Sequence, residues 1–126
     1  MPLRVTIRFD FDADRRLGPG KIALLEAIRK TGSISAAGRA HQMSYRRAWL
    51  LVEDLNKSFD GPLVAAHPGG ARGGGATLTP AGERIVALYR AAEAKMRAAA
   101  VEEIVGLETA AECEPRLALM GAESSA

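Results

Sequence analysis

The most distinctive polar stretch of the sequence is Ser44-Tyr45-Arg46-Arg47, whose side chains can all donate hydrogen bonds. Arginine pairs in a bidentate manner with the acceptors on the major-groove edge of guanine, and it also anchors on phosphate oxygens. A further cation, Arg72, stands among glycines, and a glycine-rich tip that carries an arginine can enter a minor groove or lie along phosphates. These residue types predict binding of a nucleic acid.

Five more residues complete the predicted contact set. Lys21 begins a predicted helix, where backbone N–H groups also approach phosphate. Arg39 lies on a short predicted helix that braces the polar stretch, and Ser33 begins that short helix. The additional contacts are Lys21, Ser33, Arg39, Gly73 and Gly74.

Several of these residues have plainer interpretations, which the sequence leaves open. Arg46 and Arg47 are then solvated helix residues, and the Tyr45 ring belongs to the core with only its hydroxyl reaching out. Lys21 fits a solvated lysine better than a phosphate contact, and residues 67–75 fit a plain hairpin tip.

Two patterns predict strands. Residues 3–12 alternate apolar and polar side chains, which is typical of a half-buried strand that needs a partner elsewhere. Short apolar runs at 63–66 and 76–79 flank the glycine-rich segment 67–75, which predicts a hairpin with a mobile tip.

Helical spacing of apolar residues predicts four helices: one from Lys21 to about Thr31, one over 34–40, one over 45–59 and one from Pro80 to about Gly106. The only tryptophan, Trp49, falls on the inward stripe of the third helix and is predicted to be a core residue. The predicted helix-terminating or capping residues are Gly32, Ser33, Ser44 and Thr79.

The last helix is longer than a small core can cover, so we expect its apolar stripe to pack against a second copy of the chain. We therefore predict a winged-helix and dimerisation domain over 1–106 and an acidic, disordered tail over 107–126. The predicted dimerisation residues are Ile85, Leu88, Tyr89, Ala92 and Met96.

Composition excludes several classes of protein. The chain has 126 residues and a net charge of +2, but residues 15–72 carry ten basic against four acidic side chains, which suits a polyanionic partner. A single cysteine, Cys113, excludes an internal disulfide and a cysteine cluster for zinc. The sequence contains no phosphate-binding P-loop, no metal-ligand spacing and no nucleophile elbow, so we expect neither an enzyme nor a metal site. No signal peptide or apolar run of about 18 residues is present, and we expect a cytoplasmic protein.

The predicted order of strand, helix, short helix, turn, longer helix, hairpin and helix is that of a winged helix-turn-helix, a mainly α fold with a small β-sheet. Three phrases carry a more specific resemblance: Gly32-Ser33-Ile34-Ser35-Ala36-Ala37, then Met43 to Trp49, then Leu78-Thr79-Pro80-Ala81-Gly82. With the glycine run 73–75, they resemble the ModE family of molybdate-responsive transcriptional regulators over about residues 3–100, and more distantly the N-terminal domains of LysR-type regulators.

The resemblance implies a homodimer that binds a palindromic operator in double-stranded DNA. By the same resemblance, Ser44, Tyr45 and Arg46 map to the reading end of the recognition helix and Arg72 to the wing. Many family members carry C-terminal oxyanion-binding modules, which residues 107–126 cannot form, so we expect a single-domain form with no cofactor. A molybdate or tungstate effector bound between protomers stays an alternative, as does an interaction protein that dimerises with a longer family member.

Overall fold

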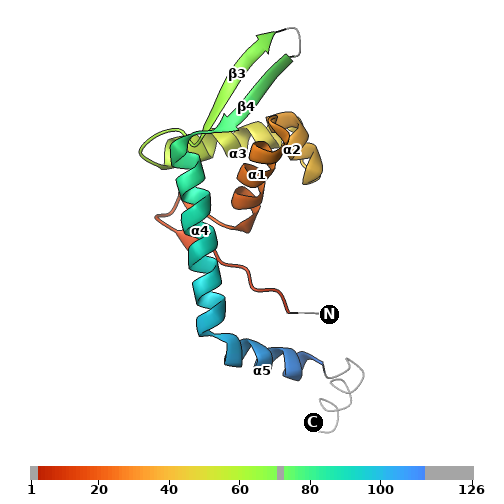
Figure 1. Ribbon diagram of the computed structural model, residues 1–126, viewed down its shortest axis with the longest axis vertical. Helices are drawn as coiled ribbons and strands as arrows, with labels where there is room; N and C mark the ends of the chain where they lie inside the picture. The colour runs from red at the N-terminus through yellow and green to blue at the C-terminus, as the bar shows by residue number, and fades with distance from the viewer. Residues whose placement is uncertain (1–2, 71–72, 113–126) are drawn as a thin grey trace. The chain divides into compact units, whose positions relative to one another are not determined.

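The computed structural model of the protein describes residues 3–70 and 73–112, with side chains outside 68–74. It is mainly helical with two small antiparallel sheets, as expected for a winged helix-turn-helix (Figure 1). None of the helices in this part of the chain is long and apolar enough to cross a membrane. In chain order the elements are β1 (Phe9–Asp10), β2 (Arg16–Leu17), α1 (Pro19–Thr31), α2 (Ile34–Ala40), α3 (Tyr45–Ser58), β3 (Val64–Gly70), β4 (Gly73–Leu78), α4 (Pro80–Ala99) and α5 (Val101–Ala111).

The described residues fall into two compact units. One unit, Thr6–Ala92, contains α1, α2, α3, both sheets and the first part of α4; we call it the winged-helix unit. The other contains the described residues on either side of it, 3–5 and 93–112, and we call it the terminal unit.

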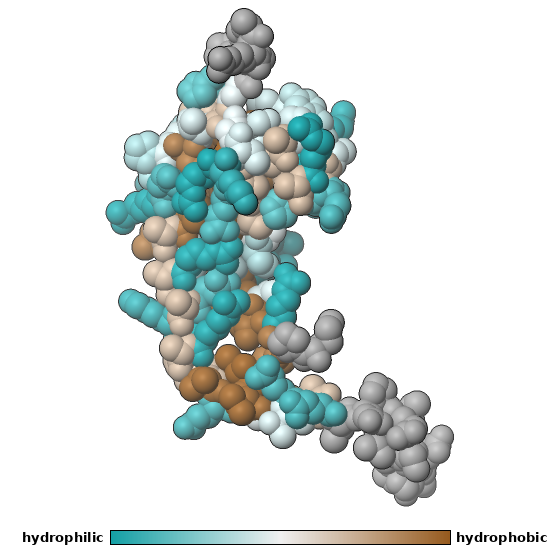
Figure 2. Space-filling view, turned by 45° about the vertical axis from the view of Figure 1, so that its right-hand side comes forward, coloured by the Kyte–Doolittle hydropathy of each residue, from teal (hydrophilic) through white to brown (hydrophobic). Residues whose placement is uncertain are grey.

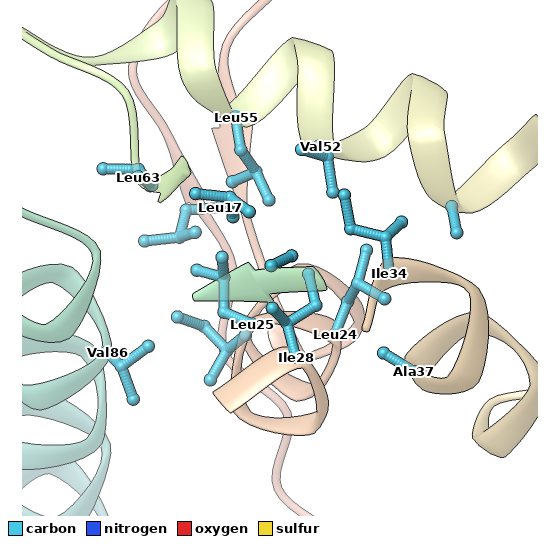
Figure 3. Packing of buried hydrophobic residues seen from close by; sticks show 14 of the residues in the cluster. Leu17, Leu24, Leu25, Ile28, Ile34, Ala37, Val52, Leu55, Leu63 and Val86 are labelled. Carbon is cyan, nitrogen blue, oxygen red and sulfur yellow. The ribbon is translucent and has the colours of Figure 1, made fainter. Parts of the chain in front are cut away.

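The core of the winged-helix unit is built around α1, whose Ile22, Leu24, Leu25 and Ile28 are fully buried. Burying a leucine or isoleucine side chain contributes about 1.5–3 kcal/mol. In Figure 3 the labelled side chains of α1, Leu24, Leu25 and Ile28, meet others from α2, α3, α4, β2 and the segment before β3. The partners labelled in that view are Leu17, Ile34, Ala37, Val52, Leu55, Leu63 and Val86.

A single side chain of α3 anchors the base of the β3–β4 hairpin, which we call the wing. The Asn56 Oδ1 atom accepts hydrogen bonds from the backbone N–H groups of Leu63 (2.8 Å) and Val64 (3.0 Å). Its Nδ2 atom donates to the Val64 carbonyl at 3.1 Å. These hydrogen bonds all go to Leu63 and Val64, where the wing begins, so they fix the wing relative to α3.

The Leu78–Gly82 phrase forms the junction between the wing and α4. The Thr79 N–H donates to the Leu63 carbonyl (2.9 Å), and the Thr79 hydroxyl donates to the Pro62 carbonyl (2.7 Å). The same hydroxyl accepts from the Gly82 N–H at 3.0 Å, which confirms Thr79 as the cap of this helix. Gly82 lies directly against the Leu63 carbonyl, and a Cβ atom there would be 2.2 Å from the oxygen.

The N-terminal strand is much shorter than predicted. Only Phe9 and Asp10 pair, with Leu17 and Arg16 of β2, a two-residue strand that the sequence pattern did not reveal. The alternation instead fixes burial, since Val5, Ile7 and Phe9 are half-buried while their neighbours are exposed. Side chains satisfy part of the unpaired backbone: the Ile7 carbonyl accepts from the Tyr89 hydroxyl.

The hairpin is confirmed, but its strands are longer than predicted. Antiparallel pairing runs from Val64 opposite Leu78 to Gly70 opposite Gly73, with an irregularity between His67 and Gly70. Most of the predicted loop 67–75 is therefore strand, because ladder hydrogen bonds use backbone groups that glycine also has. Residues 71 and 72, and with them the predicted contact Arg72, lie outside the described residues.

The predicted C-terminal helix is two helices. The helix is interrupted at Ala100, which has φ −108° and ψ 20°, and α5 then runs to Ala111. Residues 107–111 are therefore helical, against the prediction that the tail begins at 107. The rest of that predicted tail, from Cys113 onward, lies outside the described residues.

Candidate nucleic-acid interface

The start of α3 places the predicted reading residues on the surface. Ser44 is the N-cap, as predicted, and its hydroxyl accepts from the Arg47 N–H at 3.1 Å. Tyr45, Arg46 and Arg47 are all exposed, whereas Ala48 on the opposite face is buried. The Tyr45 ring is 59% exposed and stands edge-on to Trp49 at 6.0 Å, so the alternative that this ring belongs to the core is wrong.

The short helix α2 braces this surface. Its bounds are those predicted, and the Ser33 hydroxyl caps it by accepting from the Ala36 N–H at 3.1 Å. Gly38 permits a close crossing of α2 and α3, since a Cβ there would be 2.9 Å from the Ala48 Cβ atom. The Met43 N–H donates to the Gly38 carbonyl at 2.9 Å and so fixes the turn between the two helices. In this arrangement the first turn of α3 protrudes from the surface, as base readout requires.

Two hollows flank the first turns of α3. The wing-side hollow, of about 410 Å³, lies between the beginnings of α2 and α3 and the wing. The α1-side hollow, of about 570 Å³, lies between α3, the beginning of α1 and the segment around β1 and β2. The wing-side hollow is lined by Ser33, Ser35, Tyr45, Trp49, His67 and Gly75, among others. The α1-side hollow includes Arg8, Asp14, Arg16, Lys21, Arg47 and Leu51.

His67 is a wing residue whose contact favours a structural role. Its Nε2 atom lies 3.2 Å from the Thr77 hydroxyl across the β3–β4 ladder. Within the described residues, no group of three His, Cys, Asp or Glu side chains is placed to hold a metal ion.

The cations near the start of α3 differ in how far they are already neutralised. Lys21 forms an ion pair with Asp54 and also donates to the Arg16 carbonyl (2.9 Å), and its side chain is only 18% exposed. Arg16, Arg46 and Arg47 have no carboxylate partner in the described part of the chain. Lys21 is therefore engaged within the fold, while the three arginines form no ion pair among the described residues.

The other predicted residues lie in separate places. Arg39 is exposed on α2, where it donates to the Ser35 hydroxyl at 2.8 Å and stays accessible. Gly73 and Gly74 belong to β4. The predicted dimerisation stripe is divided: Tyr89 is buried in the winged-helix core and packs edge-on against Phe9, whereas Leu88 is 53% exposed.

An ion pair between α1 and α4 lies apart from the residues above. Arg90 donates to both Glu26 carboxylate oxygens, at 3.0 and 2.6 Å. These hydrogen bonds lower the pKa of the Glu26 carboxyl below its ordinary value.

Sequence reasoning missed two arginines, Arg8 and Arg16. Both line the α1-side hollow beside Arg47, although 31 residues separate Arg16 from it in the sequence. The uneven charge over residues 15–72 includes Arg16 but does not say where its side chain lies, and Arg8 is outside that range.

The sequence is similar to several curated proteins whose names refer to molybdenum or to ModE. Curated relatives include the molybdenum-pterin-binding protein MopB of Rhodobacter capsulatus, 53% identical over 63% of this chain and 29% of that protein. The molybdenum transport protein ModE of Azotobacter vinelandii is 42% identical over 71% of this chain and 33% of its own length. The transcriptional regulator ModE of Yersinia pestis is 45% identical over 56% of this chain and 27% of its own. The chain thus spans about a third of these relatives or less, and the ModE resemblance is confirmed for that region.

The family comparison covers the elements that build the interface. The sequence of residues 20–83 matches the family of bacterial regulatory helix-turn-helix proteins called the lysR family. That range includes α1 from Gly20 onward, the bracing helix α2, all of α3 and the whole wing. The chain therefore belongs to the lysR family of bacterial regulatory helix-turn-helix proteins.

Proposed function

We propose that the chain is a sequence-specific transcriptional regulator of the ModE type, which binds double-stranded DNA in the cytoplasm and controls molybdenum-linked genes. One observation carries this proposal: the exposed first turn of α3 presents Arg46 and Arg47 without carboxylate partners among the described residues. The names of the relatives support the link to molybdenum.

In the proposed complex the first turn of α3 enters the major groove, which is about 12 Å wide and admits one helix. Arg46 contacts base edges, because it projects from the centre of the outward face of this turn. Ser33 and Tyr45 line the wing-side hollow and contact the backbone beside the groove, and the wing extends toward the neighbouring minor groove. These contacts need no cofactor.

Sequence selection from random duplexes tests this function. The full chain should enrich an inverted repeat whose half-sites lie about 34 Å apart, one helical turn of DNA. Affinity for the selected duplex should fall steeply between about 50 and 200 mM salt, because bound arginines release counterions from phosphate. A matched pool carried through without protein is the control. A protein pool no more enriched than that control would contradict the proposal, and a parallel selection with molybdate tests for an oxyanion effector.

We also propose that the regulator is a homodimer. Helix α5 buries none of its side chains in the chain itself and exposes Val101, Val105 and Leu107 by 53–60%. Figure 2 shows apolar side chains gathered on the surface around α5. Apolar surface of this kind favours association, and a twofold partner would suit an inverted repeat.

The homodimer is tested by placing charge on this face. The double substitution Val101→Asp and Val105→Asp, one turn apart on the same face of α5, should convert the dimer to a monomer in sedimentation experiments, because ionised carboxylates resist burial in an apolar interface. Ala110→Asp, which adds a charge at an exposed position on the opposite side of the same helix, should leave the dimer intact. A double variant that sediments like the unmodified chain would exclude α5 as the interface.

A further inference from the structure

Helix α3 has two flanks, and each opens into a different hollow. Tyr45 and Trp49, one turn apart on α3, line the wing-side hollow. Arg47 and Leu51, also one turn apart, line the α1-side hollow. Because residues of a helix advance about 100° each, these two pairs lie on opposite sides of the outward residue Arg46.

Basic side chains outnumber acidic ones in the lining of the α1-side hollow. Arg8, Arg16, Lys21 and Arg47 line it, against a single acidic residue, Asp14. Arg8 is paired with Asp10 at 2.8 Å and Lys21 with Asp54, but Arg16 and Arg47 have no carboxylate partner in the described chain. The Arg16 guanidinium donates to the backbone carbonyl of Ala13, at 3.4 Å. Two arginines from different elements thus line one hollow without forming an ion pair in the described chain, an arrangement that suits an anion with several oxygens.

We propose that the α1-side hollow seats the second phosphate backbone of the major groove, with Arg16 and Arg47 as its contacts. This rests on the proposed function, since it assumes that α3 enters the groove. A helix about 10–12 Å across fills a groove about 12 Å wide, so both flanks of the helix must meet a backbone. The wing-side hollow meets one strand and the α1-side hollow meets the other. Arg16 therefore positions the protein on DNA without reading sequence.

Gly20 allows this inference to be tested without disturbing the fold. Gly20 lines the hollow at the beginning of α1, and a Cβ atom there would meet nothing within 4 Å. Gly20→Glu places a negative charge in the hollow, and an acidic residue in the first turn of a helix stabilises that helix. Gly61→Glu is the matched control: a Cβ there also meets nothing within 4 Å, and Gly61 lines neither flanking hollow.

The measurement is the dissociation constant for the selected duplex and for a random duplex over a salt series. Gly20→Glu should weaken binding to both about 10-fold or more, and Arg16→Ala should weaken both about equally and reduce the salt slope by about 1. Gly61→Glu should change neither by more than about twofold, because its charge is screened over roughly 10 Å. Thermal melting of each variant verifies that it is folded.

The outcomes separate this inference from the proposed function. If the unmodified chain binds no duplex, the proposed function fails. If it binds while Gly20→Glu and Gly61→Glu behave alike, only the second backbone seat is overturned. Calorimetry with inorganic phosphate and molybdate adds one more arm: binding of a free oxyanion that Gly20→Glu abolishes, with DNA affinity unchanged, would make the hollow a small-anion site and overturn the backbone assignment.

Discussion

Replacing Gly82 with alanine should lower the free energy of unfolding by about 3 kcal/mol, the upper range for an overpacked site. The new Cβ atom would lie 2.2 Å from the Leu63 carbonyl oxygen and 3.1 Å from its carbon. These are backbone atoms, which cannot turn aside as a side chain can. The Leu63 carbonyl also accepts from the Thr79 N–H, so relieving the clash breaks the junction between the wing and α4.

Chemical denaturation of both variants measures this effect. The control is Gly20→Ala, which also replaces a helical glycine of the winged-helix unit but meets open space. Without a clash, this change favours the helix by up to about 1 kcal/mol, so the two variants should shift stability in opposite directions. A Gly82→Ala protein as stable as the unmodified chain would show that α4 does not cross the segment before β3 as closely as described.

Replacing Arg46 with alanine should weaken binding to the selected operator by about 1–3 kcal/mol and relax the choice of base at the position it contacts. Arg46 can contact a base because it is exposed in the first turn of α3 and has no carboxylate partner among the described residues. A bidentate arginine contact with guanine discriminates against the wrong base by a similar amount.

Lys57→Ala is the matched control for Arg46. Lys57 is exposed near the other end of α3, eleven residues or about 16 Å along the same outward face. Its removal should affect operator and random duplexes alike and only slightly. Competition binding with single-base operator variants distinguishes the roles: equal losses for Arg46→Ala on operator and random DNA would make Arg46 a phosphate contact and remove it from base readout.

Features whose chemistry is local were predictable from the sequence. Gly32 has φ 71° and its N–H closes the end of α1 on the Ile28 carbonyl, and Ser33 and Ser44 cap the next two helices, all as predicted. Each of these residues acts on backbone groups within four positions of itself, so its residue type and place in the pattern suffice. The beginning of α2 followed directly from Ser33.

Features that depend on distant partners were not predictable. For Lys21 the sequence favoured a solvated lysine over a phosphate contact, but the fold brings Asp54 to it from 33 positions away. Arg8 and Arg16 join Arg47 only through the packing of the N-terminal segment on α1 and α3. The paired glycines of the wing were not predicted to be strand for a different reason. Period-two patterning is carried by side chains, and Gly73 and Gly75 have none.

The amide of Asn56 has a consequence for how the protein would select its DNA. Because this side chain ties the base of the wing to α3, the spacing between the two is set before any duplex arrives. Little entropy is then lost in ordering the joint on association. A duplex whose groove widths do not match this fixed spacing must deform in order to bind. The energy of that deformation depends on the DNA sequence, so base pairs that no side chain contacts also influence the affinity.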